Sequence, residues 1–213
     1  MPTLPPAALL ALALQHAPQV APETMLAVIQ AESGGDPFAI YDNTAKQSHR
    51  PATKAEAVAT ARRLLGRGHN IDSGLAQVNS ANFARMGLTV ETAFEQGESV
   101  RAGGAILTEA YRRCEPGRTP LEALRCALSI YNTGRSAAGI INGYVAKVWK
   151  AADVIVPAIR SAGPLPSPSP PPQDDDPSDP APPSWDTFAR VEWEIRMEER
   201  RSAPVTTVRR IKE

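Results

Sequence analysis

The distribution of proline divides this chain of 213 residues into a part that can fold around a core and a part that cannot. Ten of its 21 prolines lie between Pro164 and Pro183, in a segment that also contains three consecutive aspartates. Such a segment has little apolar surface to bury and few backbone donors, so we expect it to be extended and solvated. The sequence therefore predicts a folded domain over residues 1–156, a proline-rich linker over 157–183 and a charged tail over 184–213.

The folded part has the pattern of an all-α domain. Alanine, leucine and arginine are common in it, and no run of alternating β-branched residues reaches the length of a strand. Two capping boxes, which begin at Thr53 and Thr119, mark helix starts, and the second is followed directly by a proline. We expect helices over residues 5–16, 22–33, 54–66, 80–86, 98–114, 120–132 and 142–153.

The tail contains one more helical pattern. Between Trp185 and Arg201, apolar residues recur at helical spacing and charges of both signs fill the other positions. Two interpretations stay open: a marginal helix attached by a linker, or a docking element for a partner protein.

Charge and hydropathy exclude some classes of function. The chain has 23 basic and 23 acidic side chains, so nothing in its net charge indicates a nucleic acid or an anionic membrane as a partner. The longest apolar run, over residues 4–14, is interrupted by two prolines and falls short of the roughly 20 residues that a transmembrane helix needs. It is also a poor secretory signal, because no basic residue precedes it and no clear cleavage site follows. The export route stays open.

Glu32 ends an apolar helical stripe. Met25, Val28 and Ile29 precede it at positions that share one face of a helix. Apolar packing and a helix C-terminus both disfavour a carboxylate, so we expect the pKa of Glu32 to be raised, as a general acid at neutral pH requires. The alternative, which the spacing leaves open, is a surface glutamate at the edge of the helix.

A second predicted helix is built in the same way. Leucines at helical spacing lead to Tyr131, and the chain then leaves the helix through residues 132–134. A tyrosine on such a stripe is usually a core residue, and that interpretation stays open. Between the two helices, residues 72–79 contain Gln77 and Asn79, whose side-chain amides suit the hydroxyl and acetamido groups of a sugar. An ordinary turn before a helix is the alternative there.

The order and spacing of these segments resemble a known family. Residues 32–40 (ESGGDPFAI), 74–79 (GLAQVN) and 127–134 (ALSIYNTG) are similar to the three motifs of the soluble lytic transglycosylase domain, which is grouped with goose-type lysozyme. The resemblance covers roughly residues 5–150 and is closest to the transglycosylases that accompany type IV secretion and conjugation machines. It implies a lysozyme-like helical fold.

The resemblance also implies an activity, a peptidoglycan lytic transglycosylase with Glu32 as its single catalytic acid and base. Glu32 would protonate the oxygen of the β-1,4 bond between N-acetylmuramic acid and N-acetylglucosamine, then take the proton of the sugar's own 6-hydroxyl as a 1,6-anhydro ring forms. Tyr131 would hydrogen-bond Glu32 or the developing charge, and Ser33 would have a supporting role. The residues implied in substrate binding are Ser33, Gln77, Asn79, Tyr131 and Asn132.

Two other functions stay possible. A hydrolytic muramidase of the same fold would use a second carboxylate, and Asp36 and Asp72 are the nearest candidates. A non-catalytic scaffold would bind peptidoglycan while its tail recruits secretion or conjugation machinery. The motif also departs from the family at Ala76, where a bulkier residue, often methionine, is common. A smaller side chain there leaves more room beside a sugar subsite.

Cysteine and histidine complete the expectations. Cys114 and Cys126 bracket a predicted helix–loop–helix connection, and a disulfide between them would stabilise the fold by about 3 kcal/mol. Reduced, buried thiols are the alternative. No metal or cofactor is expected, because His16, His49 and His69 lie far apart in the sequence and the cysteines lack ligand spacing. Peptidoglycan as the implied substrate favours a periplasmic location, where a disulfide can form.

Overall fold

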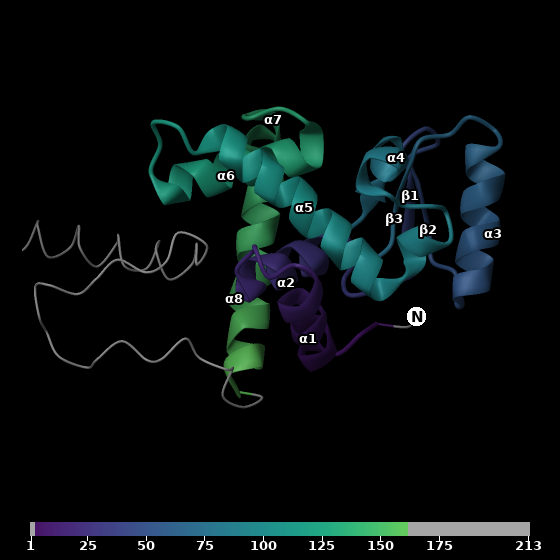
Figure 1. The fold of residues 1–213 in the computed structure, drawn as a ribbon, viewed down its shortest axis with the longest axis horizontal. Coiled ribbons are helices and arrows are strands. Elements are labelled where there is room, and N and C mark those ends of the chain that lie inside the picture. The colour runs from purple at the N-terminus through teal and green to yellow at the C-terminus, as the bar shows by residue number, and fades with distance from the viewer. Residues whose placement is uncertain (1–2, 162–213) are drawn as a thin grey trace, which may run out of the picture.

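The computed structural model describes residues 3–161 (Figure 1). Most of the linker and all of the tail, including the helix predicted between Trp185 and Arg201, lie outside the described residues. No helix in the described range is both long and apolar enough to cross a bilayer. The helices are α1 (Pro6–His16), α2 (Pro22–Glu32), α3 (Lys54–Leu65), α4 (Phe83–Met86), α5 (Gln96–Cys114), α6 (Pro120–Thr133), α7 (Ala138–Ile141) and α8 (Tyr144–Ser161), with 3-10 turns η1 (Ser80–Asn82) and η2 (Thr92–Phe94).

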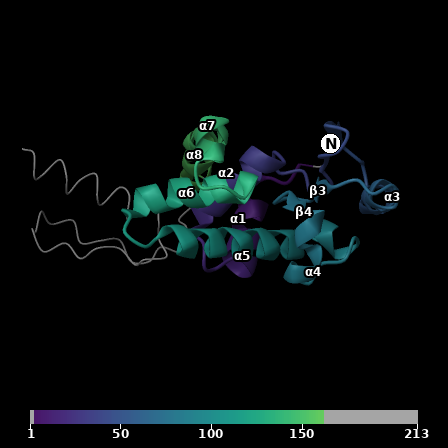
Figure 2. The same ribbon diagram turned by 90° about the horizontal axis from the view of Figure 1, so that it is seen from above.

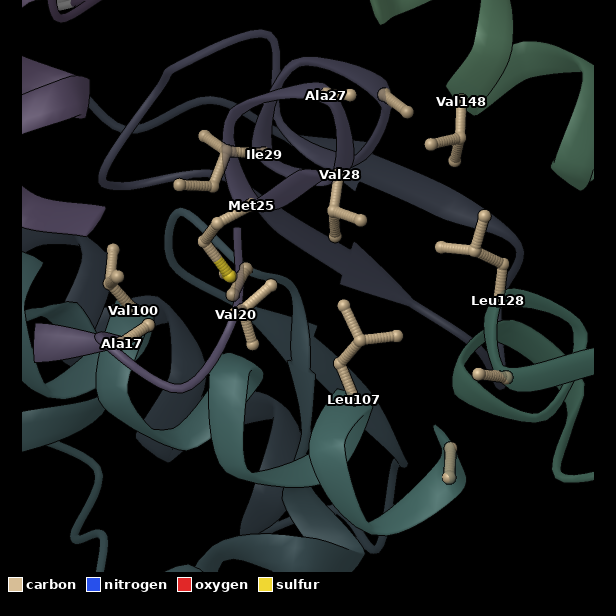
Figure 3. Packing of buried hydrophobic residues seen from close by; sticks show 14 of the residues in the cluster. Ala17, Val20, Met25, Ala27, Val28, Ile29, Val100, Leu107, Leu128 and Val148 are labelled. Atoms are coloured by element: carbon tan, nitrogen blue, oxygen red, sulfur yellow. The ribbon is translucent and has the colours of Figure 1, made fainter. Parts of the chain in front are cut away.

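Helix α2 lies at the centre of the main core. Seven of its eleven residues are buried, and a helix that is apolar on most sides is stable only when other helices enclose it. Helices α1 and α8 pack against it. Figure 3 shows Leu107 of α5, Leu128 of α6 and Val148 of α8 gathered around Val28 of α2. The apolar stripe that ends at Glu32 is therefore held between several helices.

Helix α5 connects the two ends of the molecule. The small sheet, α3 and α4 lie towards its N-terminal end, and α6 and α7 lie towards its C-terminal end (Figures 1 and 2). Helix α5 packs extensively against α6 and also contacts α1. The elements that carry the motif segments thus meet along one helix.

A small antiparallel sheet was not predicted. It consists of β1 (Ile40–Asp42), β2 (Gln47–His49), β3 (Ile71–Ser73) and β4 (Val78–Asn79) in the order β2-β1-β3-β4. Strands of two or three residues are too short to show the alternating pattern that identifies a strand in a sequence. A separate apolar cluster, with residues from the sheet and from α3, lies beneath it. Helices still predominate, so the predicted all-α class is confirmed.

The predicted helices are present, with differences at their ends. Thr119 and Glu122 form the expected capping box. Thr53 accepts the backbone N–H of Glu56, but the Glu56 carboxylate accepts from Ala52 instead of from the cap residue. The helix predicted over 80–86 is divided into η1 and α4, α5 begins earlier than expected, α7 was missed, and α8 continues to Ser161.

Candidate active site

A groove of about 490 Å³ opens beside the end of α2. Its lining combines residues from the C-terminal ends of α2 and α6, from the sheet and its loops, and from α4 and α5. The lining residues are Glu32, Asn43, Asn70, Asp72, Gln77, Val78, Asn79, Asn82, Arg85, Ile106, Glu109, Ala110, Arg113, Ile130, Tyr131, Asn132, Thr133 and Gly134. All three motif segments therefore contribute to one groove.

Glu32 is the last residue of α2, and its carboxyl group is partly buried at the groove. The Tyr144 hydroxyl donates a hydrogen bond of 2.6 Å to Glu32 Oε1. Burial raises the pKa of Glu32 from 4.5 to about 7, against the opposing effect of the Tyr144 hydrogen bond. The negative charge of Asp72 raises this pKa further, and the positive charge of Lys147 lowers it. A carboxyl group with such a pKa can both give and take a proton near neutral pH.

Buried hydrogen bonds fix the turn that follows Glu32. Ser33 is buried, and its Oγ donates to the carbonyl of Ile29 at 3.2 Å and accepts from Gly35 N at 3.1 Å. Arg50 Nη1 donates to the Ser33 carbonyl at 2.8 Å and to Asp36 Oδ2 at 3.2 Å. Ser33 is thus not among the residues that line the groove, and its geometry favours the supporting role over direct contact with substrate.

Asp36 and Asp72, the two candidates for a second carboxylate, lie in different surroundings. Asp36 is only 1% exposed and is paired with Arg50, and it does not line the groove. Asp72 lines the groove, and burial raises its pKa above the ordinary value although hydrogen bonds from Asn43 and Asn79 oppose the shift. Of the two, only Asp72 is placed where it can face a substrate in the groove.

A network of amides surrounds Asp72. Its Oδ2 accepts from Asn43 Nδ2 at 2.8 Å, and its Oδ1 accepts from Asn79 Nδ2 at 2.7 Å. Asn79 and Asn70 exchange two further hydrogen bonds, of 2.6 and 2.8 Å, between their side-chain amides. The sequence predicted Asn79 but not Asn43 or Asn70. Strand pairing brings these residues together, and strands this short have no alternating pattern by which the sequence could reveal the pairing.

Gln77 reaches the groove from a turn that it helps to hold. Its backbone has a φ of +47°, an unusual value for a residue with a side chain. Gln77 Nε2 donates to the carbonyl of Ala39 at 3.0 Å and to that of Gly74 at 2.9 Å. Its Oε1 accepts no hydrogen bond from the described residues, so this oxygen is available to a hydroxyl or N–H group in the groove.

Tyr131 lines the groove but does not hydrogen-bond Glu32, which corrects one of its two predicted roles. The Tyr131 hydroxyl donates to the carbonyl of Ala76 at 2.6 Å and so joins α6 to the turn that precedes β4. The phenol that contacts Glu32 belongs to Tyr144, a residue not predicted for the site. The available signal was its place at the start of the apolar stripe of α8, one residue after Gly143.

Ala76 also differs from its prediction. It is completely buried and is not part of the groove lining, so its small size does not enlarge a sugar subsite. A side chain at Gly103 of α5 would place its Cβ only 2.5 Å from the Ala76 Cβ. The small residues at both positions instead permit α5 to approach the turn.

Asn132 and the two cysteines complete the predicted set. Asn132 is exposed at the groove, and its Oδ1 accepts from Asn142 Nδ2 at 3.0 Å. A disulfide joins Cys114, the last residue of α5, to Cys126 of α6. The structure thus brings Glu32, Gln77, Asn79, Tyr131 and Asn132 to one groove and leaves Ser33 buried beside it.

Comparisons with known proteins point to one family. The family model described as the transglycosylase SLT domain matches residues 10–151. Protein virB1 of Rhizobium radiobacter is 37% identical over 172 residues, which cover 81% of this chain and 68% of that protein. Type IV secretion system protein virB1 of Brucella abortus is 39% identical over 165 residues, covering 71% of this chain and 69% of that protein. No solved structure gives a significant match. The range matched by the family model contains every residue of the groove.

Proposed function

Since the chain belongs to the transglycosylase SLT domain family, we propose that it is a peptidoglycan lytic transglycosylase that forms a 1,6-anhydro product. Its substrate is the β-1,4 bond between N-acetylmuramic acid and N-acetylglucosamine. The observation that carries the proposal is the Glu32 carboxyl group, which lies at the groove with a pKa near 7 and a phenol donor on its Oε1.

In the first step, protonated Glu32 gives its proton to the glycosidic oxygen. The bond between this oxygen and C1 of N-acetylmuramic acid breaks, and an oxocarbenium-like centre remains at C1. The pKa near 7 supports this step, because a useful fraction of the protein carries the proton at neutral pH. Tyr144 keeps one carboxyl oxygen in place and stabilises the carboxylate that the step produces.

In the second step, the Glu32 carboxylate takes the proton of the 6-hydroxyl of the same N-acetylmuramic acid. The hydroxyl oxygen forms a bond to C1 and closes the anhydro ring, so Glu32 is protonated again and no water is consumed. Gln77 and Asn132 hold the sugars through their amides, and the free Oε1 of Gln77 suits a hydroxyl or acetamido N–H. Tyr131 lines the groove beside them, with its hydroxyl donated to the Ala76 carbonyl.

A hydrolytic muramidase is the second candidate, and the position of Asp72 favours it. This carboxyl group lines the same groove as Glu32, and inverting hydrolases use a second carboxylate to activate water. However, both Asp72 oxygens already accept hydrogen bonds from asparagine amides, and burial raises its pKa. These hydrogen bonds occupy the oxygens that would take a proton from water, and they oppose the rise in pKa that burial causes, so we favour the transglycosylase.

The mass of the product separates the two candidates. Purified peptidoglycan is digested with the full chain, and the released muropeptides are analysed by mass spectrometry. A transglycosylase releases anhydro products that are lighter by one water than those of a hydrolase. Products with the hydrolytic mass would contradict the proposal, and absence of any release would favour the non-catalytic scaffold.

The proposed setting is the periplasm, where the enzyme opens the wall for a type IV secretion or conjugation apparatus. The names of the virB1 relatives support the secretion context. The disulfide between Cys114 and Cys126 supports an oxidising compartment. We retain the division into a catalytic domain, a proline-rich linker and a tail that recruits machinery proteins as a proposal.

A further inference from the structure

The lining of the groove changes from mostly uncharged to charged where α4 and α5 contribute to it. Around Glu32 and Asp72, most of the polar lining consists of uncharged amides, whereas Arg85, Glu109 and Arg113 line the α4–α5 wall. A second, more open hollow of about 570 Å³ is lined by Arg85, Glu109, Arg112 and Arg113. Because three of these four residues also line the groove, the hollow adjoins it.

The positive charge of this hollow is only partly compensated. Arg85 forms a salt bridge to Glu109, and its other terminal nitrogen donates to Asn82 Oδ1 at 3.3 Å. Within residues 3–161, neither the Arg112 nor the Arg113 side chain has a hydrogen bond or an ion pair. Two exposed guanidinium groups thus remain available for an anion at the edge of the groove.

The backbone that carries these two arginines is fixed. Both lie in the last turn of α5, where the helix dipole favours cations. The next residue, Cys114, is linked by the disulfide to α6, and its carbonyl accepts from Arg118 Nη1 at 2.8 Å. The C-terminal end of α6 also lines the groove, so the disulfide ties the helix that carries the arginines to another helix of the lining.

We propose that Arg112 and Arg113 form an anion subsite for the peptide stems of peptidoglycan. This inference rests on the proposed function, since it assigns a second part of the same polymer to the same groove. The stems are attached to N-acetylmuramic acid, the sugar whose C1 reacts, and they carry free carboxylates. Guanidinium groups bind carboxylates through paired hydrogen bonds. The amide-lined part of the groove then holds sugars, and the arginines hold the peptide beside them.

The test compares three soluble glycan polymers: strands with peptide stems, strands stripped of stems by an amidase, and strands whose stem carboxylates are chemically amidated. The full chain and its Arg112→Gln/Arg113→Gln variant are assayed on each for kcat/KM. The variant is expected to lose about tenfold more activity on strands with free stem carboxylates than on the other two polymers. This preferential loss should shrink as the salt concentration rises.

A matched variant, Arg63→Gln/Arg67→Gln, removes the same charge from the surface at the end of α3, outside the groove. It should behave like the unaltered chain on all three polymers. An equal loss on every polymer, or no loss at all, in the Arg112/Arg113 variant would overturn the subsite while the proposed function stands. If the unaltered chain cleaves none of the polymers, the proposed function fails and the subsite with it.

Discussion

Tyr144 Oη lies 2.6 Å from Glu32 Oε1 and donates a hydrogen bond to it, although the two residues are 112 positions apart. The contact joins the first residue of α8 to the last residue of α2, two helices that pack extensively against each other in the main core. Burial, followed by the nearby Glu32 charge, raises the pKa of Tyr144 well above its ordinary value, so its hydroxyl stays protonated and remains a donor. This phenol therefore helps to fix the position of Glu32 and opposes the rise in its pKa that burial causes.

Removing this phenol hydroxyl should shift the pH dependence of the reaction. The hydrogen bond stabilises the Glu32 carboxylate, so Tyr144→Phe should raise the pKa of Glu32 from about 7. Because the first step needs protonated Glu32, the descending limb of the profile of kcat against pH should move up by about one pH unit. The maximal rate should fall, since the carboxyl group loses an anchor. Tyr41→Phe, at a tyrosine outside the groove, is the control, and an unchanged limb in Tyr144→Phe would contradict this role.

Glu32→Gln should abolish lysis. The amide cannot give a proton to the glycosidic oxygen, and removal of a general acid–base group costs roughly a hundred- to ten-thousandfold in rate. Glutamine has nearly the same shape, so binding of glycan strands should be almost unchanged. Turbidity of cell-wall suspensions measures lysis, and co-sedimentation with peptidoglycan measures binding. Undiminished lysis would remove Glu32 from the mechanism, and loss of binding as well would indicate a damaged fold.

Local signals in the sequence predicted the helices and the position of Glu32. Caps, prolines and apolar spacing act within one or two turns, so Pro22 and Thr119 mark helix starts that the structure reproduces. The raised pKa of Glu32 followed from its place at the end of an apolar stripe, and the structure gives the same direction for the same reason. The family resemblance added the chemistry, which spacing alone did not supply.

The parts that sequence did not predict depend on contacts between distant segments. The Tyr144 contact requires the packing of α8 on α2, and the asparagines around Asp72 require the register of very short strands. Ala76 is small because α5 passes close to it at Gly103, a relationship that no local pattern contains. Tertiary packing decides each of these cases.

The disulfide should contribute measurably to stability. It closes a short loop between α5 and α6, and loops of this length are stabilised by about 3 kcal/mol in chain-entropy estimates. The Cys114→Ser/Cys126→Ser variant should therefore unfold at a temperature lower by about 10 °C. A reducing agent should lower the unfolding temperature of the unaltered protein but leave that of the variant unchanged. Two free thiols in the denatured, unreduced protein would contradict the bond.

The raised pKa of Glu32 also predicts how stability changes with pH. The group has a pKa of 4.5 when unfolded and about 7 when folded, so the folded state holds its proton more tightly. Below about pH 4.5 both states are protonated, and Glu32 makes no pH-dependent contribution. As the pH rises from 4.5 to 7 the unfolded state ionises first, and folding loses free energy progressively until the folded group also ionises.

Glu32→Gln removes this loss, because its side chain does not ionise. At pH 8 the variant should unfold at a temperature about 5 °C above that of the unaltered protein, and at pH 4 the difference should be much smaller. Thermal unfolding followed by circular dichroism at both pH values measures the effect, with the exposed Glu115→Gln, outside the groove, as the control. A difference between Glu32→Gln and the unaltered protein that is the same at both pH values would mean that Glu32 ionises normally in the folded protein.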